Sequence, residues 1–213
     1  MELEHSHGLL YFVDAALGDE LPEEDAARAE GYRGVRRQTF IAGRTALSRA
    51  LQRLGAGRVS IPSDDRGAPI PPPGFVGSIS HKGDRAVAIA ALDEGFDIGV
   101  DLEFIRPVRD SLSEAILTPA ERARVARDED RELSTLASFS IKEAIYKAID
   151  PSVRRYVGFH EAELVLPPIG PEFAKVIATM TMAHGEPAPV IEATIALVDG
   201  CIVATARALR TRW

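Results

Sequence analysis

The stretch Gly99-Val100-Asp101-Leu102-Glu103 predicts the strand around which the other elements are arranged. Its acidic and apolar residues alternate, and side chains on a strand repeat with a period of two, so Asp101 and Glu103 point to one face. Two adjacent carboxylates repel each other unless a hard cation or a hydrogen-bond network compensates their charge. The pair is therefore either half of a divalent-metal site or a solvated strand edge.

A helix is predicted over 132–149, because apolar residues recur there at helical spacing, and Pro151 is expected to end it. The helix contains the sequence FSIKEAIYK. Glu143 and Lys147 are four residues apart in it, so they lie one turn above the other. They form either a surface ion pair or, with Lys142, part of a site where Mg²⁺ and a phosphorylated ligand meet.

The composition is that of a globular protein. The 213 residues, with 46% hydrophobic content, are sufficient for one large domain or two small ones. No apolar run approaches the length of a membrane span and no signal-peptide pattern is present, so a cytoplasmic protein is expected. Cys201 lies in an apolar stretch and is expected to be buried. The formal net charge of -7 disfavours nucleic-acid binding, so a polyanionic ligand needs a local basic cluster.

A second long helix, predicted over 33–54 and ended by Gly55, offers one such cluster. Arg36, Arg37 and Arg44 lie along the surface opposite its apolar side. They either solvate an outer face or form a phosphate clamp, because guanidinium groups bind phosphate oxygens through paired hydrogen bonds.

A second group of anion donors follows the segment 63–77, which is rich in proline and glycine and is predicted to be an ordered loop. This loop leads into a strand that ends with Ser80, His81 and Lys82. Side chains at a strand end are often structural, but these three offer several anion donors together.

Shorter elements complete the prediction. A capping box of Thr118 and Glu121, with a proline between them, predicts the start of a helix. Alternating or apolar runs predict further strands at 9–13, 86–92, 156–166 and 175–183, and a closing hairpin of 190–198 and 201–209.

Two pairs of segments almost a hundred residues apart resemble each other: LPEE at 21–24 with LTPAE at 117–121, and FIAGR at 40–44 with FSIKE at 139–143. This ordered repeat predicts an α+β fold of two similar halves, 1–97 and 98–213, related by a pseudo-two-fold axis. Arg44 and Glu143 would then lie at equivalent positions across a shared cleft, basic on one side and acidic on the other.

Five motifs follow one another across most of the chain: F-x-x-G-R at 40–44, G-x-P at 67–69 before GSISH at 77–81, GVDLE at 99–103, ILTP-x-E at 116–121 and FSIKEA-x-YKA at 139–148. In this order they resemble the 4′-phosphopantetheinyl transferases of the surfactin type, in particular the enterobactin-synthase-component-D branch. Two places depart from the family pattern. Ile70 and Pro71 stand where many members carry an aromatic residue before the proline, and Lys82 stands where many relatives have cysteine or a small residue.

The resemblance implies transfer of the 4′-phosphopantetheine arm from coenzyme A to a serine of an acyl or peptidyl carrier protein, with release of adenosine 3′,5′-bisphosphate. A Mg²⁺ ion bridging the pyrophosphate oxygens would neutralise the charge that builds on the leaving phosphate. Coenzyme A and a carrier protein are the implied partners of a monomeric enzyme, without nucleic acid or membrane. The implied context is secondary metabolism, such as polyketide or nonribosomal peptide biosynthesis.

The same resemblance implies roles for individual residues. Asp101, Glu103 and Glu143 match the family's metal carboxylates. The proton acceptor for the carrier serine would be Glu143, directly or through a metal-bound water, with Glu103 second, and His81 would assist catalysis. The other matched residues are basic or carry a hydroxyl and would hold coenzyme A: Lys142 and Lys147 on phosphate oxygens, Ser80 with His81 on the pyrophosphate or 3′-phosphate region, and Arg36 (or Arg37), Arg44 and Arg66 on the 3′-phosphate and adenine end.

Two alternatives stay open. A Mg²⁺-dependent phosphohydrolase would also use three carboxylates and basic residues, but it would release inorganic phosphate without a carrier protein. A module that binds coenzyme A without chemistry would keep the arginines and His81 but would not need Glu143. The residues do not indicate which carrier protein is served.

Overall fold

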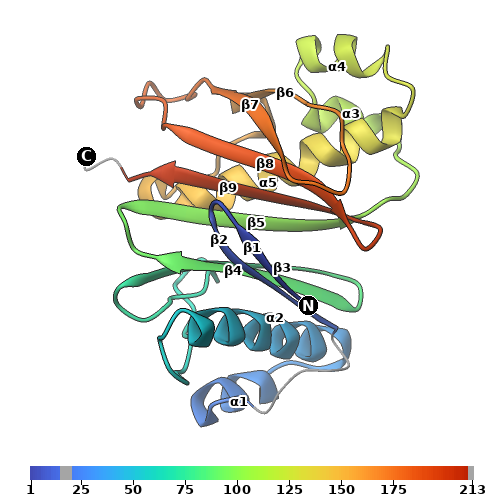
Figure 1. Cartoon of the computed structure of the whole chain (residues 1–213). Helices are drawn as coiled ribbons and strands as arrows, with labels where there is room; N and C mark the ends of the chain where they lie inside the picture. Colours follow the sequence, from blue (N-terminus) through green and yellow to red (C-terminus); the bar gives the residue numbers. More distant parts are fainter. Residues whose placement is uncertain (15–20, 211–213) are drawn as a thin grey trace.

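The computed structural model describes residues 1–14 and 21–210. These residues form two antiparallel sheets, one of four strands and one of five (Figure 1). The first sheet has the strand order β1-β2-β4-β3 and contains β1 (Glu2–His5), β2 (Gly8–Asp14), β3 (Phe75–Lys82) and β4 (Arg85–Leu92). Between β2 and β3 the chain forms the helices α1 (Glu23–Glu30) and α2 (Gly34–Arg53).

The second sheet has the strand order β5-β9-β8-β7-β6. Its strands are β5 (Phe96–Phe104), β6 (Ala162–Val165), β7 (Ala174–Met180), β8 (Ile191–Val198) and β9 (Cys201–Leu209). Between β5 and β6 lie α3 (Asp110–Ile116), α4 (Pro119–Val125), α5 (Arg131–Val153) and a short 3₁₀ helix, η2 (Phe159–Glu161).

The two halves share one connectivity. In the first half, β2 leads to the long helix α2, and the hairpin β3–β4 follows, with β4 returning to pair with β2. In the second half, β5 leads to the long helix α5, and the hairpin β8–β9 returns β9 to pair with β5. This confirms the predicted α+β fold with two similar halves.

Two apolar clusters each pack a helix on its own sheet, and a third joins the two halves. Small residues of α2, such as Ala42 and Ala46, pack on the alanines of β4, and Ile141 and Ile145 of α5 pack on β8 and β9. The opposite faces of the two sheets meet in a third cluster that includes Ile89 of β4 with Val100 and Leu102 of β5 and Val203 of β9. Apolar burial on both faces of each sheet therefore places β3 and β4 beside β5.

Gly99 permits the closest approach between β5 and α5. A Cβ atom at this position would lie 2.0 Å from the carbonyl oxygen of Ala144 and 2.9 Å from the backbone nitrogen of Ala148. Only glycine allows this backbone contact, so the residue that opens the GVDLE motif sets the distance between Asp101 and the helix that carries Glu143.

A buried ion pair joins α4 to α5. Lys142 is 3% exposed, and its Nζ donates to Glu121 Oε2 at 2.7 Å and to the Ile116 carbonyl at 2.9 Å. Glu121 also completes the predicted capping box with Thr118 and accepts from the Leu164 backbone N–H at 2.8 Å. Lys142 therefore makes structural contacts, and its expected contact with phosphate oxygens stays a prediction.

Two predicted elements differ from the structure. Helix α5 continues through Pro151 to Val153 and ends where Arg154 takes a positive φ of 50°. A proline near a C-terminus removes only its own N–H bond, and the Arg154 N–H still reaches the Asp150 carbonyl at 2.9 Å. The strand expected over 156–166 is limited to β6, because η2 occupies the residues before it.

The turn between β1 and β2 contacts the second sheet through two histidines. His5 Nε2 lies 2.9 Å from Thr194 Oγ1, and His7 Nδ1 lies 2.8 Å from Thr205 Oγ1. The two threonine hydroxyls are 2.9 Å apart, so one hydrogen-bonded chain crosses from the first sheet to the second. Among the described residues, no helix is both long and apolar enough to cross a bilayer.

We predict that Gly99→Ala destabilises the protein by about 1–3 kcal/mol, because the added methyl group meets backbone atoms that cannot rotate away. Urea unfolding measures the change. Gly170→Ala is the matched control, since a Cβ there meets nothing within 4 Å. Equal unfolding free energies for the two variants would contradict the close contact between β5 and α5.

We predict that Lys142→Met lowers the free energy of unfolding by about 3 kcal/mol, because Glu121 loses its charged partner in a buried site. The backbone N–H groups of Thr118 and Leu164 still donate to Glu121, so we expect a loss near the lower end of the range of about 3–5 kcal/mol for breaking a buried ion pair. Lys175→Met, at an exposed position, is the control. Wild-type stability combined with weakened coenzyme A binding would instead support the phosphate contact.

Candidate active site

Asp101 lies where the two halves meet. Its carboxylate, on β5, is only 5% exposed and accepts three hydrogen bonds. Ser80 Oγ of β3 donates to Oδ1 at 2.9 Å, Ser140 Oγ of α5 donates to Oδ2 at 2.9 Å, and Lys147 Nζ of α5 donates to Oδ1 at 2.8 Å. Ser80 therefore positions Asp101, and its expected contact with a phosphorylated ligand stays a prediction.

Glu103, two residues further along β5, is 4% exposed. Its Oε1 accepts a hydrogen bond from Lys82 Nζ at 2.8 Å. Its other oxygen, Oε2, is buried and has no hydrogen-bond partner in the described part of the chain. A buried oxygen without a partner carries a large desolvation cost, which is expected at a position that a ligand completes.

Glu143 faces these two carboxylates from α5. Burial raises the pKa of the Glu143 carboxyl; Lys147 opposes this, and the charges of Asp101 and Glu103 raise the pKa further. No hydrogen bond or ion pair joins Glu143 to another residue within 1–14 and 21–210. Glu143 therefore lies near enough to the other two acids for their charges to act on it, and its role as a metal ligand or proton acceptor stays a prediction.

The donor chemistry fits Mg²⁺, which takes hard oxygen ligands. A carboxylate oxygen accepts about two hydrogen bonds, so Asp101 Oδ2 keeps one free position and Glu103 Oε2 keeps both. The described residues contain no group of three or more His, Cys, Asp or Glu that could hold a metal as they stand. Two of the three carboxylates are instead paired with ammonium groups, Glu103 with Lys82 and Asp101 with Lys147.

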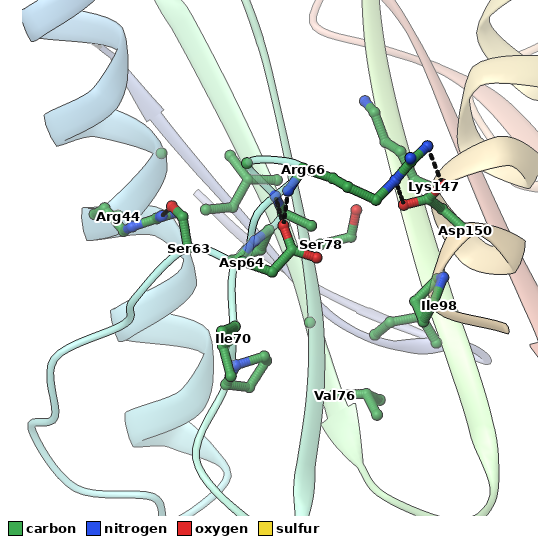
Figure 2. A pocket seen from close by; sticks show the side chains of 18 of the residues that line it. Arg44, Ser63, Asp64, Arg66, Ile70, Val76, Ser78, Ile98, Lys147 and Asp150 are labelled. Carbon is green, nitrogen blue, oxygen red and sulfur yellow. Dashed lines mark hydrogen bonds and ion pairs between the residues drawn. The ribbon is translucent and has the colours of Figure 1, made fainter. Parts of the chain in front are cut away.

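A cleft of about 1030 Å³ lies beside these residues, between the two halves. Figure 2 shows Arg44 on α2 at one side and Lys147 and Asp150 on α5 at the other, with the loop that carries Ser63 and Arg66 between them. Both halves thus contribute a wall, but Glu143, the predicted acidic counterpart of Arg44, is not among the lining residues.

Arg44 forms the basic wall. It is 5% exposed, its Nη2 donates to Ser63 Oγ at 2.6 Å, and its guanidinium lies 4.9 Å from the centre of the Phe40 ring. Its Nε is buried and, among the described residues, has no hydrogen-bond partner. Burial lowers the pKa of Arg44, and an anion in the cleft would supply the missing acceptor and favour the charged guanidinium.

Two further predicted residues line the cleft near Arg44. Arg36 of α2 lies 5.2 Å from the centre of the Tyr32 ring, whereas Arg37, its possible substitute, is not among the lining residues. His81 lines the cleft from β3, and partial desolvation, followed by the charges of Arg36 and Lys147, lowers its pKa. A neutral imidazole at this position can donate from one nitrogen and accept at the other.

Arg66 bridges the two walls of the cleft. Its Nε donates to Asp150 Oδ2 at 2.8 Å and its Nη2 donates to the Tyr146 hydroxyl at 2.7 Å, so a loop of the first half is held on α5 of the second. The predicted clamp residue is therefore in the cleft but already has an acidic partner. Its contact with a ligand stays a prediction.

Sequence reasoning assigned no role to Tyr146, Asp150 or Ser140. The first two lie three residues beyond Glu143 and Lys147, on adjoining positions of one helical face, and this spacing could have indicated them. Ser140 is one turn before Glu143 on the same helix. Its contact with Asp101 depends on the packing of β5 against α5, which the local sequence does not encode.

Comparison with known proteins agrees with this arrangement. A model of the 4′-phosphopantetheinyl transferase N-terminal domain matches residues 24–91, and a model of the 4′-phosphopantetheinyl transferase superfamily matches residues 97–191. Among curated relatives, 4′-phosphopantetheinyl transferase Npt of Nocardia iowensis is 36% identical over 61% of this chain and 59% of its own length. PptT of Mycobacterium tuberculosis is 35% identical over 68% of this chain and 64% of its own length.

The match therefore spans less than two thirds of these two relatives. A longer alignment joins the chain to 4′-phosphopantetheinyl transferase Svp of Streptomyces mobaraensis, with 31% identity over 84% of this chain and 75% of the relative. The two family models together include the long helices α2 and α5 and the strands β3 and β5 that lie between them. The chain belongs to the 4′-phosphopantetheinyl transferase superfamily.

Proposed function

We propose that this protein transfers the 4′-phosphopantetheine group from coenzyme A to a serine of an acyl or peptidyl carrier protein and releases adenosine 3′,5′-bisphosphate. The observation that carries the proposal is one cleft with a buried, incompletely paired guanidinium on one wall and a group of acids beside the other. A phosphorylated ligand can contact both sides of such a site at once.

The basic wall would hold the 3′-phosphate end of coenzyme A. Arg44 has a free donor, Nε, in a site from which water is largely excluded, and such a donor binds an anion more strongly than an exposed one. Arg36 and His81 would add donors along the same wall. The phosphate end would thereby be fixed, so that the pyrophosphate is directed to the acids.

The acidic group would hold Mg²⁺ through Asp101, Glu103 and Glu143. When bound, the ion would stabilise the negative charge that develops on the pyrophosphate during transfer. Ser80, Ser140 and Lys147 keep the Asp101 carboxylate in one orientation. Glu143, whose pKa is raised by burial, is the group we assign to accept the proton of the carrier serine, with Glu103 second.

Several finer assignments belong to the same proposal. The surfactin-type branch is supported by the presence of two halves, each with a long helix on a sheet. The change of sheet between Leu92 and Phe96 supports a boundary near residue 97. The monomeric state, the cytoplasmic location and a role in secondary metabolism stay predictions. A phosphohydrolase is the alternative that the same carboxylates would serve.

We expect the protein to add phosphopantetheine to an apo-carrier protein in the presence of coenzyme A and Mg²⁺, seen as a mass increase of the carrier. Asp101→Asn should lower kcat/KM at least about a hundredfold, because the variant loses a charge worth several kcal/mol to the bound ion. Asp128→Asn, at an exposed turn, is the control. Release of inorganic phosphate from coenzyme A without carrier modification would favour the phosphohydrolase.

We also expect Arg44→Ala to raise the KM for coenzyme A about tenfold or more, because the variant loses one charge-assisted hydrogen bond. The KM for dephospho-coenzyme A should rise much less, because this substrate lacks the 3′-phosphate. Arg53→Ala, on the same helix but paired with Glu2 outside the cleft, is the matched control. Equal changes for the two substrates would argue against a contact with the 3′-phosphate.

A further inference from the structure

Lys82 contacts the acidic group through the register of two neighbouring strands. It is the last residue of β3, and it lies on the same face of that strand as Ser80. Ser80 Oγ donates to Asp101 at 2.9 Å, and Lys82 Nζ donates to Glu103 at 2.8 Å, so alternate residues of β3 meet alternate residues of β5. The ammonium is thus aligned with the acids by the sheets themselves.

The two lysines of the acidic group are held differently. Lys147 Nζ has a second acceptor, the Val100 carbonyl at 2.9 Å, which fixes its position beside Asp101. For Lys82, Glu103 is the one hydrogen-bond partner among the described residues, and the lysine side chain is 35% exposed. Lys82 is therefore the ammonium that can leave its carboxylate at the lower cost, because water and a flexible four-carbon chain are available to it.

Charge balance gives this contact a consequence for cation binding. When ionised, the three acids carry three negative charges: Asp101, Glu103 and Glu143. The ammonium groups of Lys82 and Lys147 contribute two positive charges. The partial neutralisation lets two of these carboxylates remain buried without a metal. A divalent cation that approaches the free Oε2 of Glu103 meets an ammonium already bound to Oε1 of the same carboxylate.

We propose that Lys82 is an internal competitor for the divalent cation, which weakens metal binding in the free protein and couples it to coenzyme A. The proposal rests on the proposed function, because it concerns the same carboxylates. The oxygens of the pyrophosphate offer Lys82 a second anionic partner. Once they are bound, the ammonium can leave Glu103, so the metal and coenzyme A bind cooperatively.

The competition predicts a tighter metal site when the Lys82 charge is removed. Like charges a few ångströms apart in a partly buried site repel strongly enough to change affinity about tenfold or more. Lys82→Met keeps the apolar stem and removes the ammonium. Lys82→Arg keeps the charge, and Lys175→Met removes one exposed lysine outside the cleft.

The test is a titration of the full chain with Mn²⁺, with free Mn²⁺ measured by electron paramagnetic resonance, in the absence of carrier protein. We expect Lys82→Met to bind Mn²⁺ about tenfold more tightly than the wild type, and Lys82→Arg and Lys175→Met to stay within about twofold of it. Unchanged or weaker binding by Lys82→Met overturns the proposal. Equal tightening by Lys82→Arg also overturns it, because the charge would then not be the cause.

A second titration includes coenzyme A, with the binding of Mn²⁺ to coenzyme A alone subtracted. Coenzyme A should raise the Mn²⁺ affinity of the wild type more than that of Lys82→Met, since only the wild type has an ammonium to displace. An equal increase in both proteins would overturn the coupling.

If Lys82→Met is unstable without metal, its Tm is measured by thermal unfolding with and without Mn²⁺. Mn²⁺ should then raise the Tm of this variant more than that of the wild type, because the shift grows with affinity. A variant that folds only with Mn²⁺ would support the competition, and a variant that stays unfolded with saturating Mn²⁺ would contradict it.

The Mn²⁺ titrations and the thermal unfolding test the role of Lys82 independently of the proposed transferase activity. Carrier modification by the wild type together with unchanged Mn²⁺ affinity of Lys82→Met would overturn the role of Lys82 and leave the transferase. Tighter Mn²⁺ binding by the variant without carrier modification by any form would support Lys82 as a competitor and overturn the transferase.

Discussion

The structure depends on the cost of burying the Asp101 carboxylate. An ionised carboxylate in a protein interior is stable only when hydrogen bonds and opposite charges replace its water. The donors come from β3 through Ser80 and from α5 through Ser140 and Lys147, so the group is satisfied only when the two halves and the helix are assembled. One acid residue therefore links the packing of the sheets to the geometry of the site.

Local patterns predicted the elements that position the site, and tertiary contacts decided the rest. The alternation around Asp101, the helical spacing around Glu143 and the capping box at Thr118 are each encoded within a few residues, and the structure has all three. Lys142 shows the limit of this reasoning. It precedes Glu143 directly, but successive residues on a helix point about 100° apart, so it enters the interior next to Glu121.

The three predicted clamp arginines lie in different surroundings, because tertiary contacts decide where each side chain goes. Arg36 and Arg44 are both on α2, and their helix carries them to the cleft. Arg66 is on a loop, where its direction depends on the partner it finds, and Asp150 of α5 lies in reach. Composition alone could not place an arginine of the first half on an aspartate of the second, because the pairing spans the cleft and depends on how far the halves are apart.

The repeated strand, helix and hairpin give each half a long helix with one side against a sheet. The sequence then gives the two helices opposite chemistry: Arg44 on α2 and Glu143 on α5. Two buried polar atoms have no partner among the described residues: Nε of Arg44 in the basic wall of the cleft and Oε2 of Glu103 in the group of acids beside the other wall. One of these atoms is a donor and the other an acceptor, but they do not bond to each other. A ligand with separate anionic groups satisfies both atoms when one group contacts Arg44 and the other is joined to the acids through a cation. This requirement favours a ligand with more than one phosphate over a single small anion.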